Sequence, residues 1–169
     1  GISNSNKISN EDSSINSYTI ENISTLSRYT GTDKLDNSKR ISLGLSTFNE
    51  QFKFDLFQTY EFTENSNFHN EEGNEDNLSD LLGAAEYKNR YKANYDFRYD
   101  INNDFLKKQN VSFFSPSIIG DFKISYLDQK RKTNSIIIQD TETLNYSLDS
   151  NKFLKFSNVN ISGLYDFKK

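Results

Sequence analysis

The chain has 169 residues, a formal net charge of −4 and a pI near 5.1, and its mean hydropathy is −0.80. Its slight acidity disfavours a nucleic-acid binder, which usually carries a basic patch, and the absence of cysteine excludes a disulfide framework and thiolate chemistry. Only 34% of the residues are hydrophobic, yet 14% are aromatic, all Phe or Tyr. Strand-forming aromatics in a polar chain indicate a sheet with one apolar and one wet face.

Residues 1–16 are polar and show no periodicity, so we expect a poorly ordered lead-in there and a β-sheet segment over residues 17–169. Gly1 opens no signal sequence, and Lys169 directly follows a strand-like run, so we expect a fragment of a larger protein. No run of about 18 apolar residues occurs, which argues against a transmembrane helix but not against strands that cross a membrane.

Period-2 alternation of apolar and polar residues dominates the rest of the chain and predicts β-strands. The clear stretches are Ile41–Leu45, Phe52–Phe62, Tyr91–Ile101, Ile118–Tyr126, Ile136–Leu148 and Val159–Phe167. Weaker ones are Tyr18–Tyr29, Leu82–Lys88 and Phe105–Phe114. We therefore predict an all-β antiparallel up-and-down meander of about eight strands, forming a partial wall of a transmembrane β-barrel.

The alternation is most complete over residues 91–101. The predicted lipid-facing set is Tyr91, Tyr95, Phe97 and Tyr99. The predicted lumen-facing set is Lys92, Asn94, Asp96, Arg98 and Asp100. A tilted strand needs about 9–11 residues to cross a bilayer, and this run has that length.

The connections between the predicted strands alternate in length. Short turns are predicted at Asn49–Gln51, Asn89–Arg90, Ser115–Ser117 and Asp149–Lys152. Longer loops are predicted at Gly31–Lys39, Thr63–Asp80 and Asp128–Ser135, with Asn102–Asp104 as the exception. Alternate loops of a meander lie at the same end of the sheet. Outer-membrane barrels have short periplasmic turns, so we expect the long loops outside the cell.

Two alternatives remain open at this point, because alternation also occurs in soluble sheets. One is a soluble cell-surface β-sandwich or adhesin-like binding module, and the other is a small complete porin-like barrel. The strands exceed the usual five or six residues of globular proteins. Charges at mid-strand, such as Asp96 and Arg98, also suit a wet lumen. Both features favour the wall of a barrel.

No residue pattern indicates an enzyme, and we expect no catalytic, cofactor-binding or metal-binding residues. The single histidine, His69, lies in the acidic loop Thr63–Asp80, where solvation is its default state. The acidic residues of that loop could attract Ca²⁺, but their spacing does not fit an EF-hand. The basic residues Lys130–Lys132 are expected in a solvated turn.

Several strings, in order, resemble the LptD family of outer-membrane lipopolysaccharide-assembly proteins. Three that resemble the family's PNEDS, NRFSGxDR and RxxYGL segments are Ser9–Ser13, Leu26–Lys34 and Lys39–Leu45. Three that resemble GQxY, SDxVG and YRFRLD are Gln58–Tyr60, Asn77–Gly83 and Tyr95–Asp100. The sequence departs from the family at Ser9, Thr30 and Lys34. From Phe105 onward only the strand rhythm supports the resemblance.

The resemblance implies the C-terminal barrel of a protein of about twenty-six strands, within the range of such barrels. It implies that the barrel lies in the cell outer membrane and inserts lipopolysaccharide into the outer leaflet. The implied partners are lipopolysaccharide, outer-membrane lipids, an LptE-like plug lipoprotein in the lumen and a periplasmic LptA-like bridge. No nucleic-acid partner is expected.

Overall fold

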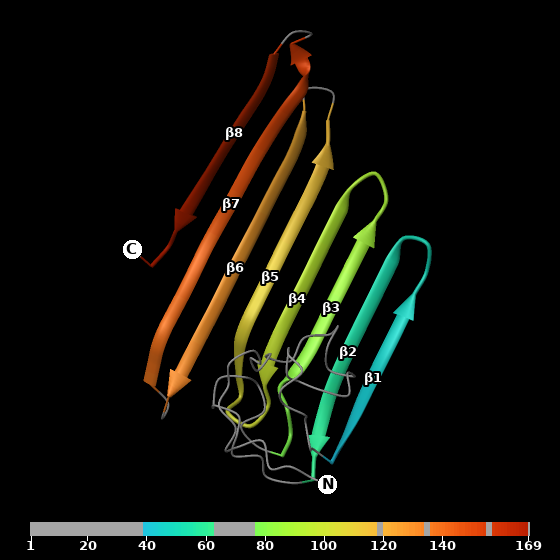
Figure 1. The fold of residues 1–169 in the computed structure, drawn as a ribbon, viewed down its shortest axis with the longest axis vertical. Coiled ribbons are helices and arrows are strands. Elements are labelled where there is room, and N and C mark those ends of the chain that lie inside the picture. Colours follow the sequence, from blue (N-terminus) through green and yellow to red (C-terminus); the bar gives the residue numbers. More distant parts are fainter. Residues whose placement is uncertain (1–38, 63–76, 118–119, 134–135, 155–156, 169) are drawn as a thin grey trace, which may run out of the picture. The chain divides into compact units, whose positions relative to one another are not determined.

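The structure is a computed structural model that describes residues 39–62, 77–117, 120–133, 136–154 and 157–168. All strands of these residues form one eight-stranded sheet in the order β1-β2-β3-β4-β5-β6-β7-β8 (Figure 1). Each strand therefore pairs with its neighbour in the chain, and β1 and β8 are the two ends of the order. The predicted all-β antiparallel meander is confirmed.

The strands are long for a globular protein. They are β1 (Arg40–Phe48), β2 (Phe52–Glu61), β3 (Leu81–Lys88), β4 (Lys92–Asp100), β5 (Phe105–Pro116), β6 (Asp121–Thr133), β7 (Ile136–Leu154) and β8 (Ser157–Asp166). Their lengths run from 8 residues in β3 to 19 in β7. Most of them reach the roughly 9–11 residues that a tilted strand needs to cross a bilayer.

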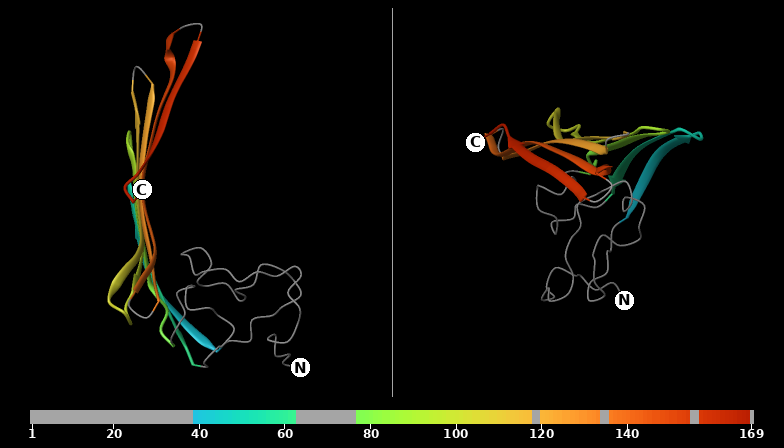
Figure 2. Two further views of the ribbon diagram at one scale, coloured as in Figure 1. Left: turned by 90° about the vertical axis from the view of Figure 1, so that its left-hand side faces the viewer. Right: turned by 90° about the horizontal axis from the view of Figure 1, so that it is seen from above.

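The chain divides into two compact units. Unit 1 comprises Gly1–Leu45, Leu56–Leu82 and Tyr99–Phe105. Unit 2 comprises Ser46–Asp55, Gly83–Arg98 and Leu106–Lys169. Within unit 2, β6, β7 and β8 lie side by side in a single layer (Figure 2). No second sheet exists in the described part of the chain, whereas a β-sandwich requires two.

Local turn chemistry explains why the strands reverse where they do. Between β1 and β2, the Asn49 side-chain oxygen accepts hydrogen bonds from the backbone N–H groups of Gln51 (2.9 Å) and Phe52 (2.8 Å). An Asn side chain that binds the backbone in this way imitates a turn. Between β4 and β5, Asp104 has a φ of 53°, in the left-handed region that Asp tolerates better than most residues.

The predicted loop at Asp128–Ser135 is wrong, because β6 continues through it to Thr133. Asp128 lies opposite Glu142 and Lys130 lies opposite Asp140 in the β6–β7 ladder. The charges resembled a solvated loop, yet they belong to a strand. The β6–β7 connection is confined to residues 134–135.

The predicted short turn at Asp149–Lys152 is also wrong, because these residues lie inside β7. Asp149 lies opposite Asn160, and the register shifts between Ser150 and Leu154. The alternation of short and long connections therefore fails at β6–β7. Connection length thus does not show which end of the sheet faces the outside of the cell. The predicted lead-in 1–16, the weaker stretch Tyr18–Tyr29 and His69 lie outside the described residues.

Candidate membrane and lumen surfaces

Burial in the described residues is the reverse of that in a soluble protein. The single buried hydrophobic side chain among them is Leu82, at 3% exposure. The buried polar residues are Asp55, Thr59, Glu61, Ser79, Asp80, Asp100, Asp128 and Ser150. Large apolar side chains are instead exposed, with Leu43 at 71% and Leu164 at 66%. Because soluble monomers rarely expose large contiguous apolar areas, such a surface is typical of contact with a membrane or with another protein.

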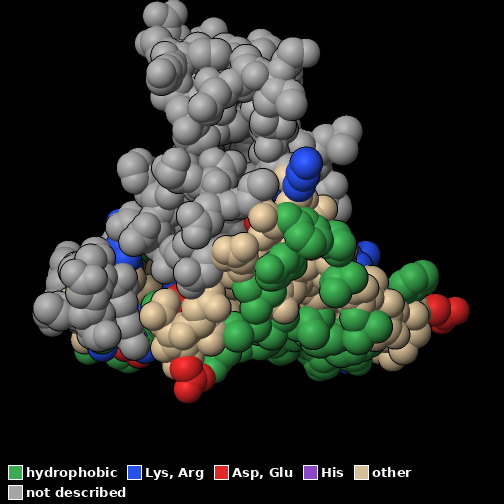
Figure 3. Space-filling view, turned by 90° about the horizontal axis from the view of Figure 1, so that it is seen from below, with side chains coloured by type: hydrophobic (Ala, Val, Ile, Leu, Met, Phe, Trp, Pro, Cys, Tyr) green, Lys and Arg blue, Asp and Glu red, His purple; other side chains and the backbone are tan. Residues whose placement is uncertain are grey.

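Most exposed apolar side chains of β5–β8 share one side of these strands, which we call the apolar face. Leu164 is an exception, because it lies opposite Asn145 on the other side. Two ladder rows that define the apolar face are Phe113–Ile124–Tyr146–Gly163 and Val111–Tyr126–Leu144–Tyr165. A third row is Ser115–Phe122–Leu148–Ile161. A space-filling view from below shows that hydrophobic side chains also gather over β1 and β2, the strands drawn on the right of Figure 1 (Figure 3).

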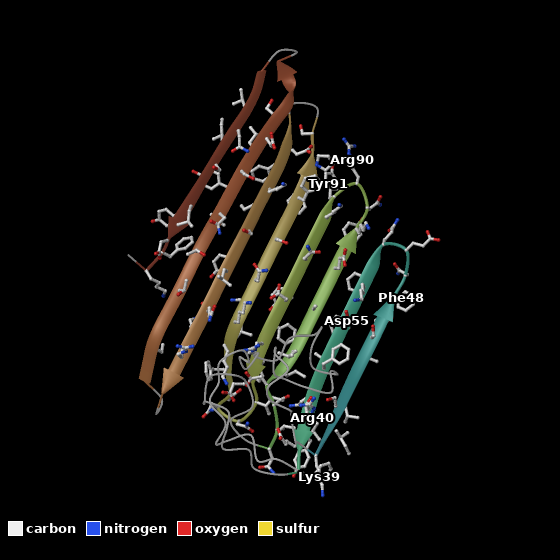
Figure 4. The ribbon with its side chains drawn as sticks, viewed as in Figure 1. Lys39, Arg40, Phe48, Asp55, Arg90 and Tyr91 are labelled. Atoms are coloured by element: carbon white, nitrogen blue, oxygen red, sulfur yellow. The ribbon has the colours of Figure 1, made fainter. Side chains whose placement is uncertain are left out.

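The predicted lipid-facing aromatics of unit 2 pack against this face or against glycine. The Tyr91 ring stacks on Phe113 with centroids 6.1 Å apart, and Tyr95 stacks on Phe97 at 5.7 Å. The Phe97 ring occupies the space in which a Cβ of Gly83 would lie. Figure 4 shows Tyr91 and Arg90 beside the β3–β4 turn.

In unit 1, the predicted residues Tyr99 and Asp100 both contact the turn that follows β4. The Tyr99 hydroxyl donates a hydrogen bond to the Asp104 carboxylate. Asp100 is buried, and its carboxylate accepts hydrogen bonds from the backbone N–H (2.9 Å) and side-chain amide (3.0 Å) of Asn103. Asp100 therefore has a structural role that alternation alone did not indicate.

The opposite side of unit 2, which we call the polar face, carries amides, hydroxyls and lysines. Asn94 donates to the Ser112 hydroxyl (3.3 Å), and Asn110 donates to the Asp96 carboxylate (2.9 Å). A hollow of about 650 Å³ lies over this face. Polar residues that line it are Lys92, Asn94, Ser112, Lys123, Ser125, Asn145, Ser147 and Ser162. Three members of the predicted lumen-facing set, Lys92, Asn94 and Asp96, thus share one polar surface.

Side-chain hydrogen bonds between hydroxyl and carboxylate groups also link β1 to β2. Within unit 2, the Ser46 hydroxyl donates to Asp55 (2.5 Å), and the Lys53 ammonium lies 2.8 Å from the same carboxylate (Figure 4). Within unit 1, the hydroxyls of Ser42 and Thr59 are 2.8 Å apart. Ser42 and Ser46 lie on the same side of β1, and this spacing in the sequence could have indicated a polar row facing β2.

A group of acidic and basic residues, which the sequence pattern did not bring together, lies at one end of the apolar face. We call it the ion cluster: Asp128, Lys130, Asp140, Glu142 and Lys168. Lys168 contacts Asp140 (3.1 Å) and Glu142 (3.4 Å), and Lys130 contacts Asp128 (3.2 Å). The hydrogen bond to Asp140 raises the pKa of Lys168. The described residues contain no cluster of His, Cys, Asp and Glu suited to a metal ion.

No helix in the described ranges is long and apolar enough to cross a membrane. Long antiparallel strands in up-and-down order, with an exposed apolar face and a polar second face, define the class of sheet that forms transmembrane β-barrel walls. A family model, LptD (LPS transport system D), matches residues 2–169. The chain belongs to the LptD family.

The family match confirms the resemblance and extends it over residues 105–169, where the strand rhythm had been the sole support. A search of curated proteins finds no match to the chain. Family membership assigns the chain a role in lipopolysaccharide transport and places it among outer-membrane proteins.

Proposed function

We propose that this chain is part of an outer-membrane β-barrel translocon that inserts lipopolysaccharide into the outer leaflet. The observation that carries the proposal is the burial pattern of unit 2. Most large exposed apolar side chains of β5–β8 lie on one face, and most polar side chains line the other, beside Phe114 and Leu164. Hydrocarbon suits the first face and a wet barrel interior suits the second, since only a closed sheet satisfies its backbone in lipid.

On this proposal, the predicted roles of the β4 residues follow from their neighbours. Tyr91, Tyr95 and Phe97 lie among apolar rings or over glycine, so they face hydrocarbon together with Tyr99. The second set, Lys92, Asn94, Asp96, Arg98 and Asp100, faces the lumen. Hydrogen bonds from β4 to β5 through Asn94 and Asp96 support this assignment.

The proposed partners follow from the family and from the polar face. Lipopolysaccharide is the cargo, an LptA-like bridge delivers it, and an LptE-like plug lipoprotein occupies the lumen. The hydroxyls, amides and lysines around the hollow offer such partners hydrogen bonds, and Phe114 and Leu164 on the same face offer apolar contacts.

The proposed function is tested in cells whose gene for this protein is under a repressible promoter. We expect repression to lower the lipopolysaccharide at the cell surface, measured with an antibody that does not enter intact cells. Re-expression of the wild-type gene should restore it. Unchanged surface lipopolysaccharide after the protein has disappeared would contradict the proposal.

The residue roles are tested separately with two plasmid-borne variants in the same cells. Phe97→Arg should fail to restore surface lipopolysaccharide because its folded protein is lost from the outer membrane. Arg98→Ala should restore it nearly fully. Immunoblots of unheated and heated membrane samples report the amount of folded protein in each strain.

A further inference from the structure

The side of unit 2 that carries the apolar face also carries charged residues, and the change occurs between adjacent rows of cross-strand pairs. The last apolar row is Val111–Tyr126–Leu144–Tyr165. One step farther along the ladder, Gln109 lies opposite Asp128, which lies opposite Glu142. The step after that pairs Lys130 with Asp140. The change of polarity is therefore shared by β5, β6 and β7 and is not confined to one strand.

The ion cluster beyond this change is held by its own contacts. Gln109 donates to one Asp128 oxygen at 3.1 Å, and Lys130 lies 3.2 Å from that same atom. The other side-chain oxygen of Asp128 and one of Asp140 are buried and have no hydrogen-bond partner in the described residues. Asp128 itself is 7% exposed. A buried carboxylate oxygen without a donor is costly, and hydrocarbon around the cluster would increase that cost.

Aromatic side chains mark the boundary. The Tyr126 ring lies in the last apolar row, and its hydroxyl donates to Glu142 at 2.9 Å. Phe167 contacts both Tyr126 (6.4 Å between centroids) and Tyr165 (4.8 Å). A tyrosine with its ring in an apolar row and its hydroxyl on an ionised row has the amphipathic placement typical of a membrane–water interface.

The length of the apolar ladder agrees with the thickness of a membrane. From Val159 to Phe167, β8 and the residue after it extend about 27 Å at roughly 3.4 Å per residue. A tilt of about 40° reduces this to about 21 Å along the membrane normal, close to the ~25 Å apolar band of such barrels. Phe167, at the end of this length, lies at the level of Glu142, so the apolar length of β8 ends at the row in which the ion cluster begins.

We propose that the hydrocarbon boundary crosses β5–β8 directly beyond Tyr126 and Tyr165, and that the ion cluster lies against the lipid headgroups. On this geometry Lys130 and Lys168 lie at the level of the lipid phosphates. The carboxylates of Asp128 and Asp140 then lie in the polar headgroup layer rather than in hydrocarbon. β6 and β7 continue past the hydrocarbon into the polar layer. The inference rests on the proposed function.

The boundary is tested by fluorescence, since the chain contains no tryptophan. Three single-tryptophan variants on or next to β8 are made in the full-length protein, with any tryptophan outside this segment replaced by Phe. They are Ile161→Trp on the apolar face, Phe167→Trp at the boundary, and Ser162→Trp as a control on the polar face. Each is refolded into phosphatidylcholine vesicles whose acyl chains are brominated near the bilayer centre or near the carbonyl groups.

We expect deep bromines to quench Ile161→Trp more than shallow ones do, and the reverse for Phe167→Trp. Neither lipid should quench Ser162→Trp. Stronger quenching of Phe167→Trp by deep bromines would overturn the boundary while leaving the membrane wall intact. If neither lipid quenched Ile161→Trp or Phe167→Trp, the barrel-wall proposal itself would fail.

A second pair of variants tests the boundary without fluorescence. Ile161→Lys should lower the ratio of folded to unfolded protein in vesicles by at least ~30-fold, as a lysine near the midplane does. Phe167→Lys should change it by only a few-fold, because lysine is tolerated near the interface. Equal losses for the two variants would overturn the boundary.

Discussion

At the scale of single residues, an aromatic ring lies over a glycine on neighbouring strands in both units. Phe97 lies over Gly83 and Tyr146 lies over Gly163 in unit 2, and Phe57 lies over Gly44 in unit 1. Glycine has no Cβ, so the ring packs directly on the neighbouring backbone. Phe57 broke the alternation of β2 in the sequence, and its contact with Gly44 explains why an aromatic occupies that position.

Phe97→Arg places a charge in the predicted lipid-facing set. We expect it to lower the free energy of unfolding by about 2–4 kcal/mol if the residue lies near the bilayer midplane. Arg98→Ala, on the adjacent position of the same strand, should be mild. Urea unfolding of the full-length protein in lipid vesicles measures both, and the reverse ranking would refute the assignment of faces.

Gly120→Ala should destabilise the β5–β6 region through the backbone. Gly120 has a φ of +153°, and a Cβ there would meet the Asp149 carbonyl oxygen at 2.6 Å. Backbone strain of this kind costs about 1–3 kcal/mol. Gly163→Ala is the matched control, because its Cβ meets the half-exposed ring of Tyr146, which can rotate away. Equal losses of unfolding free energy in the two variants would show that steric overlap of the added Cβ, rather than the backbone conformation of Gly120, causes the destabilisation.

The polar contacts of single residues were the least predictable part of the site. Alternation predicts that Tyr95 and Phe97 lie on one face of β4 and Asn94 and Asp96 on the other, because a strand places every second side chain on one face. It gave no partner for any of them, since a cross-strand neighbour depends on register. Ser112 and Asn110 emerged as partners only once β4 and β5 were aligned.

At the scale of elements, Tyr126 joins β6 to β7 at the end of the apolar ladder. Tyr126→Phe removes the hydroxyl that donates to Glu142, and a net loss of about 0.5–1 kcal/mol is expected for one hydrogen bond. Tyr146→Phe is the control, because the Tyr146 hydroxyl makes no hydrogen bond among the described residues. Urea titration in vesicles compares the two variants. A larger loss for Tyr146→Phe would refute the role given to Tyr126.

The lengths of β6 and β7 show where sequence patterns fail at this scale. The alternation of apolar residues ends near Tyr126 and Leu148, so both strands were expected to end there. Both continue, because a ladder requires only backbone hydrogen bonds: β6 continues beyond Tyr126 opposite β7, and β7 continues beyond Leu148 opposite β8. Charged residues disfavour a strand in hydrocarbon but not in the headgroup layer. The pattern therefore marked the apolar part of each strand rather than its end.

At the scale of the whole chain, the order of the strands was predictable because each strand pairs with the next. Short connections favour a meander, and the eight strands follow it without a crossover. The ordered strings of the first hundred residues indicated the family, and the family model confirms it. The orientation across the membrane was not predictable from connection lengths, because the β6–β7 connection proved to be short.

The chain expressed by itself should require detergent. β1 and β8 end the strand order, so each has an edge without a neighbouring strand among the described residues, and such edges pair with other chains. The exposed apolar face adds a second route to association, because water is a poor solvent for it. We expect aggregation in aqueous buffer and dispersion in a mild detergent, measured by size-exclusion chromatography with light scattering. A soluble monomer in buffer alone would mean that the exposed rings are covered by protein, and hydrocarbon would no longer be the phase that they require.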